Sequence, residues 1–274
     1  MYMWKWEGEN AKGTIVIVHG AAEHHGRYKW LIEMFRMHGF HVVAGDLPGQ
    51  GTTSRSRRGH IDSFDEYIEA VASWVHEASV YEQPVFLLGH SMGGLVVIRT
   101  LQEKRLPVRG VILSSPCLGL VHYPSKALEI ASRILNVIHP KKRFPSGLTV
   151  EMATRNEEVR EMDKNDSLYV TKVSVRWYRE LVKAIRIAHD NIADLPDVPM
   201  LVMQAGDDKI VDKSAVKSWF DQLTVSEKVY KEWPKLYHEI FNELEREQVF
   251  LYAHTFLSLQ LQRGELIERS NKSV

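Results

Sequence analysis

The sequence has a single cysteine, no excess of charge of either sign, and no long run of apolar residues. The one cysteine, Cys117, has no partner for a disulfide within the chain. Lysine plus arginine and aspartate plus glutamate number 35 each, and a chain without a basic excess is not expected to bind nucleic acid. There is no run of about 18 apolar residues to span a membrane, and the first residues, MYMWKWEGENAKG, contain no apolar core of a signal peptide. We therefore expect a cytoplasmic protein that is free to lie against a membrane surface.

What is present is an alternation of two kinds of apolar pattern. Continuous apolar runs are typical of strands buried on both faces, and they lie at residues 14–20, 40–47, 85–91, 110–116 and 200–206, with a more polar edge candidate at 228–233. Segments whose apolar residues recur three and four apart are typical of helices, and they lie at residues 27–39, 64–79, 92–104, 214–223 and 246–266. A chain of 274 residues is long enough for one large α/β domain or two small ones. The alternation predicts a mostly parallel sheet with helices on both faces.

The alternation stops between residues 118 and 195, where no convincing strand is present. We therefore expect residues 1–117 and 196–274 to form the core and residues 118–195 to form a helical insertion, or cap. Its segments 124–140 and 173–189 carry apolar stripes at helical spacing. The stripes could pack on the core, line an acyl pocket, or contact lipid as a lid. The candidates for a pocket lining are Leu128, Ile134, Leu135 and Trp177.

The segment VFLLGHSMGGLVV, residues 85–97, carries the strongest local signal for chemistry. The segment begins with four apolar residues and ends in a helical pattern, so the chain changes from strand to helix around Ser91. Gly89 and Gly93 stand where a side chain would collide in so sharp a turn. This is the spacing of a nucleophile elbow, which projects the serine hydroxyl above the end of the sheet. The alternative is a small residue in a tight turn.

A serine hydroxyl needs a base, and the base needs a group that orients it. After an elbow of this kind, the expected chain order is serine, acid, histidine. In the loop GDDKIVD, Asp207 and Asp208 compete for the acid role, and we prefer Asp208 because an apolar pair that would anchor the loop follows it. Asp212 fits better as a helix cap. His238 is the candidate base, since it lies between the last predicted strand and the last predicted helix.

An oxyanion that forms during acyl transfer needs backbone amides to stabilise it. The amide of Met92, directly after the serine, is the first candidate. The segment TIVIVHGAAEHHGRY supplies the second, because its strand ends at Gly20 and the amide of Ala21 can then point to the same position.

Other reactive side chains have weaker cases. His24 and His25 are adjacent, whereas zinc-binding histidines favour a spacing of one helical turn, so we expect no metal site. His19 and His90 lie beside the predicted oxyanion loop and elbow and fit structural roles. Cys117 has no histidine close to it in sequence, and we expect it to be buried or to line a pocket.

The segments HGAAEHHGRY, GDLPGQGTTSRSRRGH, GHSMGG, AGDDKIVD and YHEIFNE together resemble the α/β-hydrolase group of monoacylglycerol lipases and lysophospholipases, especially its bacterial lysophospholipase-like members. The resemblance covers almost the whole chain. It implies that Ser91 is the nucleophile, Asp208 the acid and His238 the base. It also implies oxyanion amides at Ala21 and Met92, and a helical cap after the sixth strand. One departure is the loop usually written GHG, which reads GQG here.

These patterns predict a serine hydrolase that cleaves a small-molecule acyl ester of acylglycerol or lysophospholipid type through an acyl-enzyme intermediate, without a metal or organic cofactor. The cap is its expected place of transient contact with membrane lipid. An alternative within the enzymes is a proline-specific aminopeptidase or another small-ester hydrolase of the same fold. An alternative outside them is a ligand-binding relative with a disused site, although the presence of every triad residue type argues against it.

A basic loop follows the fourth-strand region of the fold, the apolar run at residues 40–47. It contains Arg55, Arg57, Arg58 and His60. These side chains could simply be solvated, or they could attract the phosphate of a lipid head group.

Overall fold

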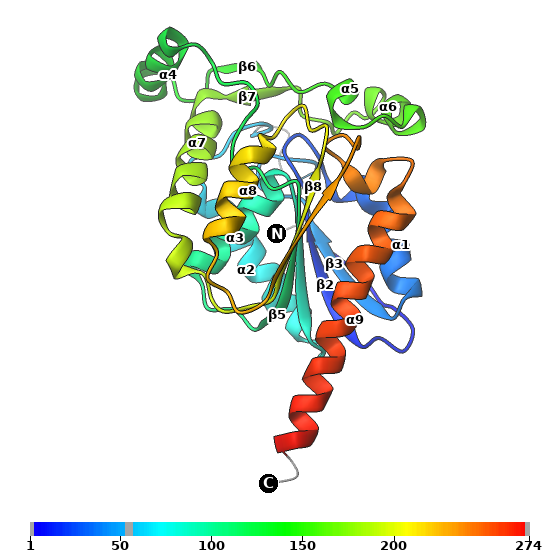
Figure 1. Cartoon of the computed structure of the whole chain (residues 1–274). Coiled ribbons are helices and arrows are strands. Elements are labelled where there is room, and N and C mark those ends of the chain that lie inside the picture. Colours follow the sequence, from blue (N-terminus) through cyan, green and yellow to red (C-terminus); the bar gives the residue numbers. More distant parts are fainter. Residues whose placement is uncertain (1–2, 53–56, 272–274) are drawn as a thin grey trace.

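The computed structural model describes residues 3–52 and 57–271, and it shows a twisted central sheet with helices on both sides (Figure 1). The strands of this sheet are β1 (Met3–Trp6), β2 (Gly13–Val18), β3 (Phe40–Gly45), β4 (Val85–His90), β5 (Val108–Ser114), β8 (Met200–Ala205) and β9 (Lys228–Trp233). Their spatial order is β1-β3-β2-β4-β5-β8-β9. Only β1 is antiparallel to its neighbour, so the expected mostly parallel sheet is confirmed.

Burial follows the apolar patterns of the strands. Every residue of β2, β4 and β8 is buried, as their continuous apolar runs predict. The more polar β9 is only partly buried and forms one edge of the sheet. The opposite edge, β1, was not expected, because its four residues, MWKW, are interrupted by a lysine and are too short a run to give a signal.

Helices cover both faces of the sheet (Figure 1). Outside the segment between β5 and β8 they are α1 (Lys29–Met37), α2 (Asp65–Ser79), α3 (Met92–Glu103), α8 (Lys213–Gln222) and α9 (Arg246–Asn271), with short 3₁₀ turns at His25–Tyr28 and Ile240–Asn242. Side chains of α2, α3 and α8 share one apolar core, and those of α1 and α9 share the other. No helix in the described part of the chain is both long and apolar enough to cross a bilayer.

The segment between β5 and β8, residues 118–195, is called the inserted segment below. Its elements are α4 (Lys126–Ile138), β6 (Arg143–Pro145), α5 (Val150–Ala153), α6 (Glu157–Lys164), β7 (Lys172–Ser174), α7 (Val175–Asp190) and a 3₁₀ turn (Ile192–Asp194). The expectation of no strand here is wrong, because β6 and β7 pair as a small antiparallel sheet of three residues each. In chain order the segment follows the fifth strand of the sheet rather than the sixth. The expected strand number assumed one more strand near the beginning of the chain than the sheet contains.

The two longest helices of the inserted segment differ in burial. In α7 the apolar stripe is buried, including Trp177, Leu181 and Ala188, and it joins the core of α2 and α3. In α4 no residue is buried. Packing on the core, one of the outcomes expected for these stripes, therefore holds for α7 and not for α4.

Candidate active site

Ser91 lies at the turn between β4 and α3, with a backbone φ of 52° and ψ of −121°. A non-glycine residue with positive φ stores strain, and such residues are concentrated at functional sites. The glycines around it allow the chain to turn so sharply: a Cβ on Gly89 would lie 2.6 Å from the carbonyl oxygen of Gly93, and one on Gly93 would lie 2.1 Å from that of Val18. The serine side chain is thereby held at the carboxyl end of the sheet.

Asp208 and His238 come together from separate loops. The Nδ1 atom of His238 lies 2.9 Å from Oδ2 and 3.1 Å from Oδ1 of Asp208. The amides of Ile210 and Val211 each donate to Asp208 Oδ1 at 2.9 Å. These hydrogen bonds fix the carboxylate against the imidazole ring.

The neighbouring aspartates do not share this contact. Asp207 is exposed, and Asp212 accepts a hydrogen bond from the amide of Ser214 at 2.9 Å, where it caps α8 as expected. Of the acid candidates, the structure brings only Asp208 to His238.

The ionisation of this pair is shifted in opposite directions. Burial opposes the charged imidazolium, but the charge and hydrogen bond of Asp208 outweigh it and raise the pKa of His238 above its usual value. Burial likewise opposes the carboxylate, but His238 and the loop amides lower the pKa of Asp208. The carboxylate is therefore ionised at neutral pH, and it stabilises a proton on the imidazole.

The predicted oxyanion loop lies beside the serine. A Cβ on Gly20 would be 3.1 Å from Cβ of Ser91, so the backbone of this loop approaches the serine closely. Ala21, Ser91 and Met92 line the same cavity. The amide of Met92 is in the first turn of α3, where helix amides lack an intrahelical acceptor. Both expected amides are thus near the serine.

The cavity at Ser91 has a volume of about 420 Å³ and a largely apolar lining. Of the stripe residues expected to line a pocket, Leu128 and Trp177 do so, whereas Ile134 and Leu135 do not. No aspartate or glutamate is among the described residues of the lining, and its one lysine or arginine is Lys209. The remaining lining comes mainly from apolar and aromatic residues such as Leu120, Phe144, Leu148, Met152, Val173, Tyr178 and Leu181.

Cys117 is buried and also lines the cavity, as expected. Burial raises the pKa of its thiol to about 12, so it is not a thiolate at neutral pH. His19 is buried with its pKa lowered to about 4 by desolvation, and its Nε2 accepts a hydrogen bond from the amide of Leu47 at 2.9 Å. Its role is structural, as expected.

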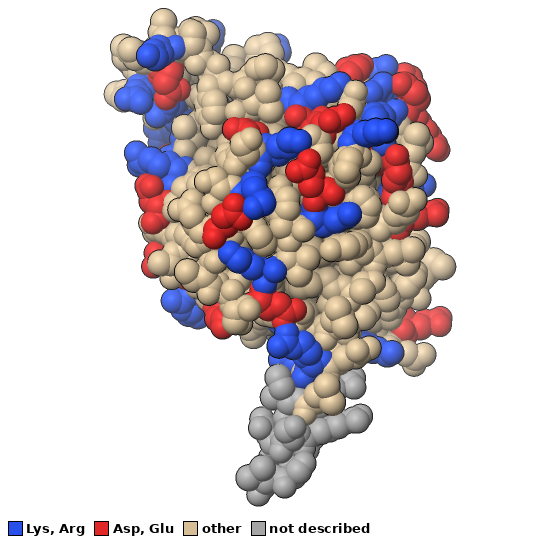
Figure 2. Space-filling model, viewed as in Figure 1, with Lys and Arg blue, Asp and Glu red and all other residues tan. Residues whose placement is uncertain are grey.

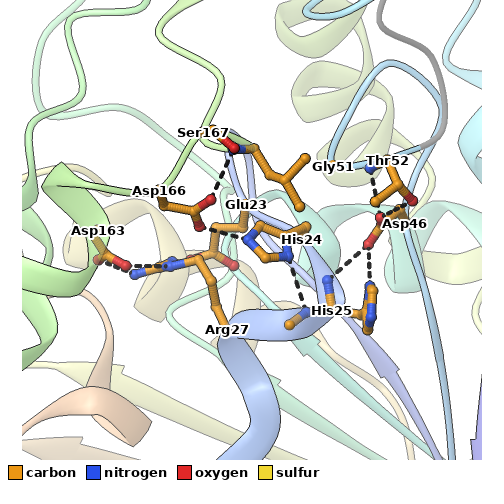
Figure 3. Close-up of polar contacts among 12 residues, drawn as sticks. Glu23, His24, His25, Arg27, Asp46, Gly51, Thr52, Asp163, Asp166 and Ser167 are labelled. Carbon is orange, nitrogen blue, oxygen red and sulfur yellow. Dashed lines mark hydrogen bonds and ion pairs between the residues drawn. The ribbon is translucent and has the colours of Figure 1, made fainter.

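A buried network of charges that we did not predict is centred on Arg27, which Figure 3 shows with Glu23 and Asp163. Arg27 donates to Glu239 at 2.9 and 3.1 Å, to Glu23 at 2.5 Å, and to Asp163 on α6. Glu23 in turn accepts from the amide of Gly20 at 2.8 Å, and Glu239 follows the candidate base directly in sequence. One guanidinium therefore joins the oxyanion loop, the histidine loop and the inserted segment. The spacing of Glu23 and Arg27, four residues apart, was the local signal for it.

Among the described residues, two groups of side chains lie close enough to hold a metal ion, and the first is His24, His25 and Asp46. In the first, His24 Nε2 is 2.6 Å from Asp166 Oδ2, and His25 Nδ1 is 2.8 Å from Asp46 Oδ1 (Figure 3). His24 Nε2 and His25 Nδ1, the nitrogens that would bind a metal ion, are therefore already in contact with carboxylates of the protein.

The second group is Glu23, His90 and Glu239, and its positive charge comes from the side chain of Arg27. Both carboxylates are paired with Arg27. His90 packs on the candidate base, His238, with 4.8 Å between the ring centroids. Both groups therefore fit structural roles, and the function proposed below uses no metal.

The basic loop makes contacts within the protein. Arg57 pairs with Asp62 at 2.9 Å, and Arg58 donates to the carbonyl of Ser167 at 2.7 Å. His60 Nδ1 lies 2.7 Å from the hydroxyl of Ser174. None of these three lines the cavity at the serine, and Arg55 lies outside the described residues.

A family model described as serine aminopeptidase, S33, matches residues 9–245. The chain belongs to this family. Among proteins similar to this member of the family is phospholipase YtpA of Bacillus subtilis (strain 168), 59% identical over 255 residues that cover 93% of this chain and 98% of the relative. The monoglyceride lipase of Homo sapiens is 28% identical and covers 88% of this chain and 80% of its own.

Solved structures agree with this family assignment. The monoacylglycerol lipase of Paleococcus ferrophilus superposes with a TM-score of 0.84 at 29% identity, covering 95% of this chain and 98% of its own. These findings confirm the expected α/β-hydrolase fold with its seven-stranded sheet, the resemblance to monoacylglycerol lipases and lysophospholipases, and the enzyme class, a serine hydrolase of the lipase and phospholipase type.

Proposed function

We propose that this S33 family member hydrolyses carboxylic esters of single-chain acyl lipids, monoacylglycerols or lysophospholipids, with Ser91, His238 and Asp208 as the catalytic triad. Ser91 attacks the ester carbonyl while His238 takes its proton, and His238 then donates this proton to the departing alcohol. Asp208 holds the imidazole in the required tautomer and stabilises its charged form. Water, activated by the same histidine, releases the fatty acid from the serine.

The amides of Ala21 and Met92 are the proposed oxyanion hole. In support, Ala21 and Met92 line the cavity together with the serine, Ala21 follows a glycine whose amide donates to Glu23, and Met92 begins α3. Donors fixed before the reaction stabilise the developing charge without reorganisation, and each contributes about a hundred- to a thousandfold to turnover.

The observation that carries the proposal is the chemistry of the cavity that opens at Ser91. Its volume of about 420 Å³ and its apolar walls suit one acyl chain. The strained Ser91 lines this cavity, and His238, which is paired with a buried carboxylate, packs on His90, the residue before the serine. Cleavage of an acyl ester uses the serine, the histidine and the cavity.

The aminopeptidase alternative fits the cavity less well, although the family description carries that word. An aminopeptidase binds a charged amine, and a buried or partly buried ammonium needs an acidic partner. The described lining offers no carboxylate and instead presents the amine of Lys209. A lipid ester requires no such partner.

The proposal is tested with a fluorophosphonate probe and with turnover of lauroylglycerol. The wild type is labelled and active, whereas Ser91→Ala loses labelling and about 10⁶-fold of its turnover, because the attacking oxygen is gone. Ser218→Ala, at an exposed serine on α8, is the matched control and keeps both. Labelling of the Ser91→Ala variant, or faster turnover of an aminoacyl amide than of the lipid by the wild type, contradicts the proposal.

We further propose that the inserted segment, residues 118–195, is the cap of the enzyme and contacts the lipid surface through α4. The outward apolar side chains of this helix include Ile130 at 59% exposure, Val137 at 82% and Ile138 at 73%. Figure 2 shows mainly uncharged side chains over α4 at the upper left, with basic and acidic groups among them. Exposed basic residues lie around this helix. These are Lys126, Arg133, Lys141 and Lys142. An apolar face bordered by positive charge suits a surface of anionic lipid.

The cytoplasm is the proposed compartment for this reaction at the membrane surface. The one cysteine of the chain is a free thiol, which suits a reducing environment.

A further inference from the structure

We propose that Lys209 forms an anion-binding subsite at the mouth of the cavity and makes the enzyme prefer lysophospholipids to neutral monoacylglycerols. This inference rests on the function proposed above, because it assigns the part of the substrate that lies beyond the scissile ester. The ligand chemistry is a phosphodiester on the glycerol of the departing alcohol.

Lys209 is placed where such a group would leave the site. It lies in the loop after β8, directly after Asp208, is exposed, and lines the cavity together with Ser91 and Met92. His238 must reach the oxygen of the departing alcohol to protonate it, so this alcohol lies toward His238. Only the short glycerol backbone separates that oxygen from the phosphate of a lysophospholipid. A cation on the loop that holds the partner of His238 is therefore within reach of the phosphate.

The position of the amine is fixed by an aromatic ring from the opposite loop. Nζ of Lys209 lies 3.7 Å from the ring centroid of Tyr237. Tyr237 precedes His238, just as Lys209 follows Asp208, so the cation contact and the triad contact join the same two loops one residue apart. The ring orients the amine without neutralising its charge.

This amine has no acidic partner in the part of the chain that the structure describes. None of the salt bridges formed by described residues involves Lys209, and the described lining of the cavity contains no carboxylate. By contrast, Arg57 is paired with Asp62 and Glu66, away from the cavity. Lys209 is therefore the positive charge available to an anionic head group at this mouth, with three donors for phosphate oxygens.

The test compares lauroyl lysophosphatidylglycerol with lauroylglycerol, both below their micelle-forming concentrations, so that the lipid surface does not contribute. In Lys209→Met the kcat/KM for the lysophospholipid falls about five- to tenfold, mainly through KM, because an exposed charge-assisted hydrogen bond is lost. The kcat/KM for lauroylglycerol stays within about twofold. Lys209→Arg keeps the wild-type preference, since it keeps the charge.

Lys231→Met is the matched control, because Lys231 also contacts an aromatic ring, with Nζ 5.0 Å from the centroid of Trp233, but does not line the cavity. It leaves both substrates unchanged. Raising the ionic strength to about 1 M reduces the preference of the wild type toward that of Lys209→Met, because salt screens an exposed ion pair.

Two results would overturn the inference and are distinct from a failure of the proposed function. If Lys209 serves only to brace the loops through Tyr237, Lys209→Met loses activity on both lipids alike and their ratio does not move. If the head group binds elsewhere, neither rate changes. A wild type that hydrolyses neither lipid contradicts the proposed function itself, and this inference with it.

Discussion

Helices α4 and α7 carry apolar stripes of similar strength, yet they use them in opposite ways. On α7 the stripe is buried against α2 and α3, where the indole of Trp177 donates to the hydroxyl of Tyr67 at 2.9 Å. On α4 most of the stripe is exposed, although Leu128 lines the cavity, and polar side chains hold the helix in place. Glu129 of α4 accepts from the Tyr178 hydroxyl at 3.3 Å, and Asn136 accepts from Arg176 at 2.7 Å.

The difference teaches that an amphipathic pattern predicts a helix and its faces but does not identify what covers the apolar face. For α7 the protein core covers it. For α4 polar side chains make the contacts with the protein, and apolar side chains are exposed. Exposed apolar side chains are unfavourable in water, so this arrangement favours an apolar environment outside the protein. In Figure 1 α4 is at the outer edge of the inserted segment, away from the sheet.

The largest expected effect separates the two helices by stability. Trp177→Ala on α7 removes a side chain that is 5% exposed and leaves a cavity, so it should lower the free energy of unfolding by about 3–5 kcal/mol. Val137→Ala on α4, at 82% exposure, should change it by less than about 0.5 kcal/mol. Urea unfolding followed by tryptophan fluorescence and circular dichroism measures both. Equal losses would mean that α4 is packed as firmly as α7.

The next effect concerns α6, a third part of the inserted segment, which is attached by charge. Arg27→Met leaves the buried carboxylates of Glu23, Asp163 and Glu239 without their cation, and we expect a loss of about 3 kcal/mol. Arg36→Met, at an exposed pair on α1, should cost less than about 0.5 kcal/mol. Urea unfolding gives the stabilities, and limited proteolysis shows whether α6 is released first. An Arg27→Met protein as stable as Arg36→Met would show that apolar contacts alone hold this region.

A third test separates the chemistry of the core from the proposed lipid contact of α4. His238 acts as a base only when neutral, and its pKa is raised above 6.5, so kcat/KM should fall about tenfold for each pH unit below that raised value. The proposed vesicle contact of α4 does not involve His238, so binding to anionic vesicles should persist. Rates on a soluble ester and sedimentation with vesicles, measured over the same pH series, distinguish the two. A midpoint of this acid limb below pH 6.5 would contradict the raised pKa of His238.

Much of the fold followed from local patterns in the sequence. The apolar run that begins at Val85 predicted a strand buried on both faces, and β4 is fully buried. The glycines around Ser91 predicted a sharp turn, and the chain turns sharply at this residue. These features depend on residues that are close together in the chain, so a pattern can reveal them.

The features that were missed depend on residues far apart in the chain. Arg27 meets Asp163 and Glu239 only after folding, and its spacing to Glu23, the one local signal, points to neither of these partners. The same limit explains why Ile134 and Leu135 were expected at the cavity but do not line it: periodicity gives the stripe of α4 and not its direction.

The smallest expected effect tests the outward face of α4 directly. The double variant Ile134→Ser and Val137→Ser should hydrolyse soluble p-nitrophenyl butyrate at the wild-type rate, because neither residue lines the cavity. On a lysophospholipid held in anionic vesicles its rate should fall about fivefold, since less apolar surface enters the lipid. The control is Leu251→Ser and Leu259→Ser on α9, at 55% and 52% exposure. If the control loses activity on the vesicles and the α4 variant keeps it, α9 rather than α4 faces the lipid. The exposed apolar side chains of α4 then have another cause.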